Sequence, residues 1–290
     1  YSEAKLADLE VGTVVGLLLN ADQTVVDAIT ADEPSVRGLL KSVDATTKTL
    51  VVSRHEGREQ AVEEKSYVLA ADAEIIVDDG KGKRYSLREG KIEELAQGAI
   101  VVLRLSLDKK QIRSVQAEGS ILTGTIKSLD ADKRVLTVVA RPARGEDAGE
   151  EKAITISKEA LVLLDDGKGR RLSLKETKLA DIPVGSAVTV KLSVDQNSVM
   201  LLRAEGPSVF GLLKSVDATK GTVTVAIPKG RDNPEEKTLT LAKDARVTLD
   251  GVVTKLGDLK IEENGPYIQL RLGLDQLTVQ AVVAHQPRPR

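Results

Sequence analysis

The stretch GLLKSVDATTKTLVV, residues 38–52, occurs in three versions along the chain. The second version is GTIKSLDADKRVLTVV at residues 124–139, and the third is GLLKSVDATKGTVTV at residues 211–225. The sequences that follow each version also resemble one another, so the three stretches mark copies of one unit of about 86 residues. A copied unit of this length predicts a tandem array of small domains.

Each copy divides into two halves, which we name A and B. The A half opens with the quoted stretch, and the B half begins with KIEELAQG (91–98) in the first copy and KLADIPVG (178–185) in the second. The first 36 residues contain KLADLEVG (5–12) and match only a B half. The order is therefore B-A-B-A-B-A-B. We expect the following domains: the second half of a preceding repeat at 1–36, and repeats at 37–120, 121–208 and 209–290.

The first B half has no A half of its own within the chain. Its apolar residues would leave an exposed surface and a bare strand edge, which favour aggregation. These residues are Val14, Val15, Leu17, Leu19, Val25 and Val26. Two coverings are expected. Either a longer parent chain supplies an A half before residue 1, or residues 1–36 self-associate with strands of a neighbouring molecule by β-augmentation.

The A half is expected to contain four strands. In the first copy they are Arg37–Val43, Thr49–Ser53, SYVLA (66–70) and AEIIV (73–77). The last of these is closed by Asp79-Gly80, a dipeptide typical of tight hairpins.

The B half is expected to contain one helical turn and two strands. Leu6 and Leu9 of the turn are predicted to plug the barrel. The strands are Ala99–Leu107 and Gln111–Ala117, joined at an aspartate in every copy: Asp22, Asp108, Asp195 and Asp275. Apolar residues alternate strictly with polar ones in VTVKLSV (188–194), as in a half-buried strand. The predicted fold is all-β: a tandem array of small six-stranded antiparallel barrels, OB-like or similar.

Composition excludes several classes of function. Lys and Arg number 42 and Asp and Glu 44, with the two signs interspersed, so we expect no nucleic-acid partner. Aromatic residues are 2 % of the chain, which argues against stacking platforms for bases or sugars. Cysteine is absent, which excludes disulfides and thiolate metal sites. The apolar run VGTVVGLLL (11–19) is shorter than the roughly 20 residues of a membrane-spanning helix, so none is expected.

The best-formed polar motif is DDGKGK (78–83), repeated as DDGKGR (165–170). Its carboxylates could ligate calcium, which prefers oxygen donors. The candidate ligands are Asp78, Asp79, Asp165 and Asp166. Against this, the spacing of a calcium loop is missing and the third copy is reduced to LDG (249–251). We therefore favour a hairpin with left-handed glycines, and expect no metal and no cofactor.

No catalytic constellation recurs in the copies. His55 and His285 have no repeated partner, so both are expected to be surface residues. Each KSVD or KSLD motif places a serine two residues before an aspartate, which is typical of a turn cap. These pairs are Ser42 with Asp44, Ser128 with Asp130, and Ser215 with Asp217. We predict that the protein is not an enzyme.

Several shared elements resemble a widespread class of small, uncharacterised bacterial β-barrel domains found in exported and surface proteins. They are the opening glycine with its apolar strand, Asp44, the Asp79-Gly80 hairpin, KLADL (5–9) with its following glycine, and RAEG (203–206). The resemblance covers essentially the whole chain and implies no catalytic residues. Tandem copying is also similar to cell-surface stalks and filament subunits.

These observations favour a non-catalytic structural repeat protein, extracellular or at the cell surface, forming part of a stalk or filament through strand pairing between units. An alternative is a binding module that presents variable loops to a protein or polysaccharide. Those loops are Arg54–Lys65, Arg141–Lys152 and Pro228–Lys237, whose sequences differ from copy to copy.

Overall fold

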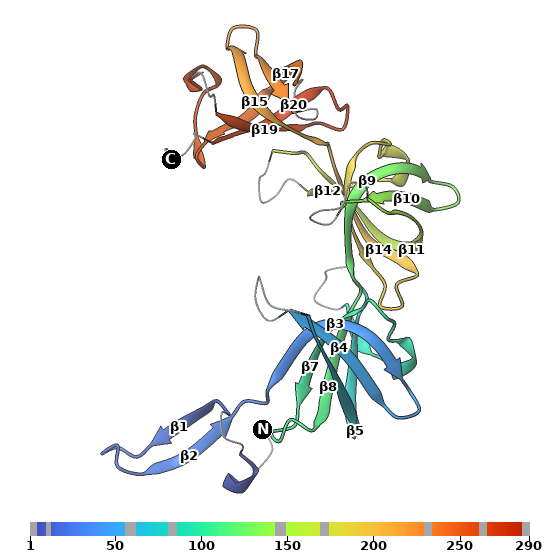
Figure 1. The fold of residues 1–290 in the computed structure, drawn as a ribbon, viewed down its shortest axis with the longest axis vertical. Coiled ribbons are helices and arrows are strands. Elements are labelled where there is room, and N and C mark those ends of the chain that lie inside the picture. Colours follow the sequence, from blue (N-terminus) through green and yellow to red (C-terminus); the bar gives the residue numbers. More distant parts are fainter. Residues whose placement is uncertain are drawn as a thin grey trace. The chain divides into compact units, whose positions relative to one another are not determined.

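The computed structural model is all-β (Figure 1). It describes residues 5–9, 13–55, 62–80, 86–142, 149–168, 174–228, 234–260 and 266–285. Within these ranges the strands form three six-stranded sheets and one two-stranded sheet. The helices of the same ranges are single 3-10 turns, and none of them has the length and apolar character needed to cross a membrane.

The first large sheet follows the strand order β4-β3-β7-β8-β5-β6. A further pairing between β4 and β5 closes five of these strands into a ring, and β6 lies beside β5 outside the ring. The strands are β3 (Ser35–Asp44), β4 (Thr49–His55), β5 (Val62–Asp78), β6 (Leu87–Glu89), β7 (Ile100–Leu105) and β8 (Gln111–Glu118).

The other two large sheets repeat this order, which is β10-β9-β13-β14-β11-β12 in one and β16-β15-β19-β20-β17-β18 in the other. The second sheet contains β9 (Ile121–Asp130), β10 (Val135–Ala140), β11 (Glu151–Asp165), β12 (Leu174–Glu176), β13 (Ala187–Leu192) and β14 (Ser198–Glu205). The third contains β15 (Ser208–Asp217), β16 (Thr222–Ile227), β17 (Glu235–Leu249), β18 (Val252–Val253), β19 (Tyr267–Leu272) and β20 (Thr278–His285).

The expected antiparallel six-stranded barrel is wrong in two details. The predicted third and fourth strands are one long strand, β5, because no glycine or proline separates SYVLA from AEIIV. This strand runs parallel to β8, and the register shifts between Leu69 and Glu74. The sixth strand is instead β6, which pairs antiparallel with the end of β5 after the predicted turn at Gly80, where φ is +81°.

Aliphatic side chains fill the first barrel. Its buried cluster includes Leu40, Leu50, Leu103 and Ile112, each 0 % exposed, and Tyr67 is its one aromatic member among the described residues. The predicted alternation is confirmed in β13, where Val188, Val190 and Leu192 are buried and the residues between them are half-buried. Strands with one inward face therefore build cores without large aromatic groups.

The predicted helical turns are also present. They are η1 (Leu6–Asp8), η2 (Ile92–Glu94), η3 (Leu179–Asp181) and η4 (Leu256–Asp258). Leu179 and Ile182 are 7 % and 5 % exposed, as expected of residues that plug a barrel. The prediction is wrong for Leu6, which is 71 % exposed because β1 and β2 form only a two-stranded sheet, and no barrel, among the described residues.

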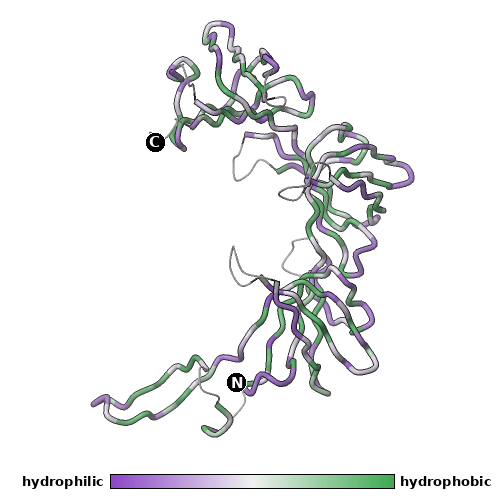
Figure 2. Tube along the Cα trace, viewed as in Figure 1, coloured by the Kyte–Doolittle hydropathy of each residue, from purple (hydrophilic) through white to green (hydrophobic). Residues whose placement is uncertain are grey.

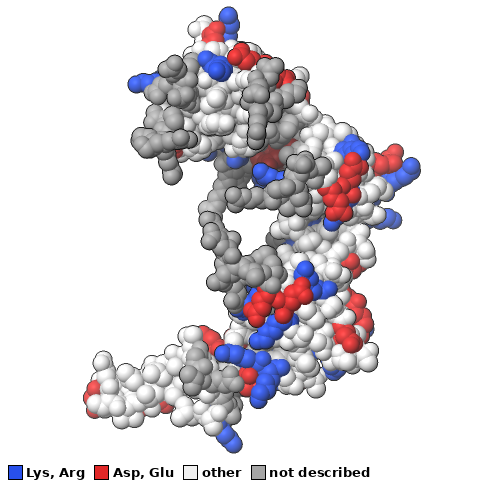
Figure 3. Space-filling model, viewed as in Figure 1, with Lys and Arg blue, Asp and Glu red and all other residues white. Residues whose placement is uncertain are grey.

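The N-terminal half-unit, residues 1–36, contains one antiparallel hairpin of β1 (Val15–Leu19) and β2 (Val26–Ala31). Residues 1–4 and 10–12 of this half-unit lie outside the described ranges. Apolar residues dominate the hairpin as they do the barrel strands (Figure 2). Few charged side chains occur on its surface (Figure 3).

A glycine near the start of each quoted stretch allows the ring to close. In the third barrel, residues 208–212 of β15 pair with β19, and residues 212–217 pair with β16. Gly211 lies where the strand passes from one neighbour to the other. A Cβ atom there would lie 2.5 Å from the carbonyl oxygen of Ala226. The corresponding distances are 2.4 Å from the Ser53 oxygen at Gly38 and 2.2 Å from the Val139 oxygen at Gly124. Only glycine fits such an approach without a shift of the backbone.

Replacing Gly211 by alanine is therefore expected to destabilise the third barrel by about 1–3 kcal/mol, because a strand must move to admit the methyl group. The matched control is Gly257→Ala in the same barrel, where the new Cβ would lie 3.5 Å from Ala218. That change should alter stability by no more than about 0.5 kcal/mol. Denaturant unfolding, followed by hydrogen exchange in residues 208–227, measures both. Equal effects of the two substitutions would contradict this account of the glycine.

Candidate functional site

The candidate site is a group of hydrogen-bonded charged side chains at the end of the first barrel, where β5 and β8 end side by side. Asp78 and Glu118 are register partners at the ends of these parallel strands. The segment Lys191–Met200 contains the end of β13, the turn and the start of β14, and it lies in the same compact unit as residues Tyr1–Ile121. We name this segment, Lys191–Met200, the docking turn.

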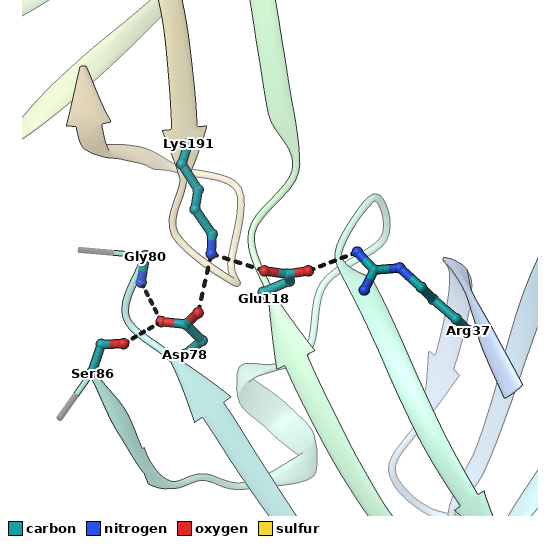
Figure 4. Close-up of polar contacts among 6 residues, drawn as sticks. All are labelled: Arg37, Asp78, Gly80, Ser86, Glu118 and Lys191. Atoms are coloured by element: carbon teal, nitrogen blue, oxygen red, sulfur yellow. Dashed lines mark hydrogen bonds and ion pairs between the residues drawn. The ribbon is translucent and has the colours of Figure 1, made fainter. Parts of the chain in front are cut away.

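Lys191 bridges the two carboxylates of the first barrel (Figure 4). Its Nζ donates to Asp78 Oδ2 at 3.1 Å and to Glu118 Oε2 at 2.8 Å. The other oxygen of Glu118 accepts from the Arg37 guanidinium at 3.0 Å. The side chains of Lys191 and Asp78 are each 16 % exposed, so water screens this ion pair less than one on the open surface.

The ionisation of these groups follows from their surroundings. Burial raises the pKa of Asp78, but hydrogen bonds from Ser86 and Gly80 and the charge of Lys191 lower it more, leaving it below 3.8. Burial lowers the pKa of Lys191, but its contacts with Glu118 and Asp78 raise it more, to a value above 10.5. The pKa values of Asp78 and Lys191 therefore keep both of these groups charged at neutral pH.

Backbone and apolar contacts hold the docking turn in place. Leu192 N donates to the Ser120 carbonyl at 2.9 Å, and Ser120 Oγ donates to Gln196 Oε1 at 2.5 Å. Val194, 5 % exposed, belongs to the buried cluster of the first barrel. At Gly119, a Cβ atom would lie 1.7 Å from the Leu192 carbonyl oxygen, so the close approach requires a residue without a side chain.

The same kind of contact recurs in the second compact unit, Leu122–Val190 with Leu201–Arg290. There the end of β19 contacts the residue before β15, because Leu272 N donates to the Pro207 carbonyl at 2.9 Å. Gln276 Nε2 donates to the Val184 carbonyl at 2.8 Å. A Cβ atom at Gly206 would lie 2.0 Å from the Leu272 oxygen. In the first unit, Leu105 N likewise donates to the Pro34 carbonyl at 2.9 Å. The bonds of Leu105 and Leu272 extend the pairing of the first A-half and B-half strands by one residue, whereas Val194 and Gln276 contact the preceding repeat.

The four candidate calcium ligands lie in hairpins rather than in a shared cluster. Asp78 Oδ1 accepts from Gly80 N at 2.9 Å and from Ser86 Oγ at 2.7 Å. Asp165 Oδ1 accepts from Gly167 N at 3.0 Å, and its Oδ2 accepts from Arg203.

The other two candidates lie in the same hairpins. Asp166 Oδ1 accepts from Lys168 N at 2.9 Å, and the backbone N of Asp79 donates to the Ser86 carbonyl at 3.0 Å. Across the described residues, no group of three or more His, Asp or Glu is placed to hold a metal ion. Asp78 and Asp165 each accept a hydrogen bond from a backbone amide of their own turn and another from a cationic side chain of β13 or β14.

The remaining sequence candidates have structural contacts. Asp44 Oδ1 accepts from Thr46 N at 2.9 Å and from Thr47 N at 3.0 Å, so the predicted turn cap is confirmed there. His285 Nδ1 lies 3.7 Å from Asp250 Oδ1 on the surface. His55 ends β4, and the central parts of the three variable loops (56–61, 143–148 and 229–233) lie outside the described residues.

Sequence analysis missed the bridge formed by Lys191, Glu118 and Arg37. A signal for it was present, because the strand position of Lys191 holds a cation in all three complete copies, as Arg104, Lys191 and Arg271. No family model matches this chain. Comparison with curated proteins likewise gives no match.

Replacing Lys191 by methionine is expected to loosen the docking turn by about 1–3 kcal/mol, since Asp78 then loses its cation and Glu118 keeps only Arg37. Lys191→Arg is the matched control, because arginine occupies this position in the other copies. The measurement is hydrogen exchange in residues 191–200 under native conditions. If the methionine and arginine variants exchange alike, the bridge contributes nothing to docking.

The pKa shifts of Asp78 and Lys191 predict how docking of this turn depends on pH. The folded pKa of Asp78 is lowered, so its contribution is present above pH 3.8 and is lost as the pH falls through the folded value. The folded pKa of Lys191 is raised, so its contribution is present below pH 10.5 and is lost as the pH rises through the folded value. As the pH falls below 3.8, protection of the docking turn should fall less in Asp78→Asn than in the unmodified chain. Identical slopes would show that Asp78 does not govern the acid transition.

Proposed function

We propose that the protein is a non-catalytic structural repeat protein that forms part of an extracellular or cell-surface stalk or filament. In this proposal its units are OB-like barrels of about 86 residues, and strand and edge pairing joins one unit to the next. The observation that carries the proposal is the recurrent docking of a B-half turn on the unit before it. Two of these contacts are Lys191 Nζ to Asp78 Oδ2 at 3.1 Å and Gln276 Nε2 to the Val184 carbonyl at 2.8 Å.

The direction of these contacts supports an extended assembly. Each contact joins the turn of one unit to a different surface of the preceding unit, so the interface is heterologous. Heterologous interfaces generate open arrays unless the rotation between units closes a ring. The residues shared by the copies serve core packing, chain reversal and this docking, which are the requirements of a scaffold.

A binding module is the second candidate. The variable loops lie at equivalent places in the three large sheets, between β4 and β5, β10 and β11, and β16 and β17. Sequence variation in an exposed hairpin of a repeated barrel is typical of a recognition surface. Removing all three loops would abolish binding of a protein or polysaccharide partner if this second function holds.

Electron microscopy of the native material tests the structural proposal. The expected result is filaments or stalks of regularly spaced barrels, because each docking turn fixes the next unit to the one before it. A chain in which Gly119 and Gly206 are both replaced by valine should lose the regular spacing, since both sites require a residue without a side chain. Isolated particles that do not associate at high protein concentration would contradict the proposal.

A further inference from the structure

The loop that follows β11 lies against the third repeat. Gly167 of this loop has a φ of +75° and approaches the third repeat's strands β19 and β20. A Cβ atom at Gly167 would lie 3.4 Å from the Leu272 carbonyl oxygen and 3.4 Å from Gln280 Cβ. The first repeat has the same arrangement, since a Cβ atom at Gly80 would lie 3.1 Å from Met200 Cβ, and Met200 occupies the sequence position of Gln280. Each loop therefore contacts the same strand of the following repeat.

Two aspartates order the loop so that it presents Lys168 to the third repeat. Asp165 Oδ1 accepts from Gly167 N at 3.0 Å, and Asp166 Oδ1 accepts from Lys168 N at 2.9 Å. The Lys168 side chain is 15 % exposed, so most of it is out of contact with water. Its Nζ donates to Asp244 Oδ2 of β17, a residue 76 positions further along the chain.

Asp244 lies in an irregular part of its strand. The pairing of β17 with β20 shifts register between Leu241 and Arg246, and a shift of this kind redirects the side chains within it. The parallel pairing of β5 with β8 in the first barrel has an equivalent shift, and Asp72 lies within that one. An acidic residue occupies this position in every complete copy, as Asp72, Glu159 and Asp244.

The cation that pairs with this acid comes from a different place in different barrels. In the first barrel, Arg113 of β8 pairs with Asp72 of the same barrel at 3.1 Å. The position of Arg113 is occupied in the third barrel by Gln280, which carries no charge. There the ion pair of Asp244 is made with Lys168 of the preceding repeat. The substitution is therefore accompanied by a change from an ion pair within a barrel to one between consecutive barrels.

A second contact joins the same two barrels at a different place. Gln276 Nε2, in the β19–β20 turn, donates to the Val184 carbonyl at 2.8 Å. A Cβ atom at Gly185 would lie 2.7 Å from the same nitrogen, so the turn lies directly on the segment before β13. Both barrels belong to one compact unit, and only Gly206 and Pro207 link β14 to β15. One contact beside so short a link would permit a hinge, whereas two contacts on different elements oppose rotation.

We propose that Lys168 is a positioning residue that, together with Gln276, holds the second and third barrels in one fixed arrangement. This inference rests on the proposed tandem array and names the side chain that sets the geometry between two of its barrels. The ion pair with Asp244 supplies the restraint on the side of β17, and the glutamine supplies it at the β19–β20 turn.

Paired spin labels test the arrangement in the full chain, which contains no cysteine of its own. The labels are attached at Lys133→Cys and Lys220→Cys, two exposed positions in equivalent turns of the two barrels. The distribution of distances between the labels should be narrow in the otherwise unmodified chain. Lys168→Met should widen it about twofold or more, because domains joined by few contacts move relative to one another.

Two further variants separate positioning from folding. Lys175→Met changes an exposed lysine of β12 in the same barrel and should leave the distribution unchanged. Lys168→Asp combined with Asp244→Lys should restore the narrow distribution, because the ion pair is rebuilt with its charges reversed. Lys168→Asp alone should widen it, since two carboxylates then face each other. A role of Lys168 confined to its own barrel would not be rescued by a change in the next one.

Two results would overturn the inference. One is a distribution in Lys168→Met that is as narrow as in Lys175→Met. The other is a wide distribution in the chain with reversed charges, which decides the question even where Lys168→Met destabilises its own barrel. Either result would leave a stalk or filament of hinged barrels possible, whereas particles that never associate would contradict the proposed function, so the two failures are distinguishable.

Discussion

Each barrel depends on the passage of one strand between two neighbours at a glycine. The strand that opens the A half pairs first with a B-half strand and then with the next A-half strand, and this joins the two halves into one ring. At Gly38, Gly124 and Gly211 the adjacent backbone comes so close that a Cβ atom would lie 2.2–2.5 Å from a carbonyl oxygen. Without this close approach, β3 could not pair with both β7 and β4, and the aliphatic core would lie open at one side.

Two kinds of contact occur where one repeat follows another: a backbone hydrogen bond and a charged bridge. They differ in whether they recur from copy to copy. The backbone hydrogen bond recurs at three junctions, and it persists at the first of them, where Glu33 occupies the place of Gly119. The charged bridge varies, since Lys191 is replaced by arginine in the other complete copies and by Leu18 in the N-terminal half-unit. Backbone geometry therefore defines the docking position, and the charged groups adjust its strength and its response to pH.

Local patterns in the sequence were sufficient to predict most strand positions, the single helical turns and the turn aspartates, but not β6. Alternation in VTVKLSV identified its buried face, and Asp44 was recognised as a cap because short polar side chains bind nearby backbone amides. Relations between distant residues were not predictable in this way. The parallel pairing of β5 with β8 and the fusion of two predicted strands depend on ring closure. The contact of Lys191 with Asp78 spans 113 positions, and no local periodicity reports it.

The short link between consecutive barrels has a mechanical consequence. β8 ends at Glu118 and β9 begins at Ile121, so only Gly119 and Ser120 separate one sheet from the next. A two-residue link can extend very little, so a pulling force applied along the polypeptide acts directly on the folded strands. Under tension the protein would lengthen in discrete steps, each released when one barrel tears open, while the others continue to bear load.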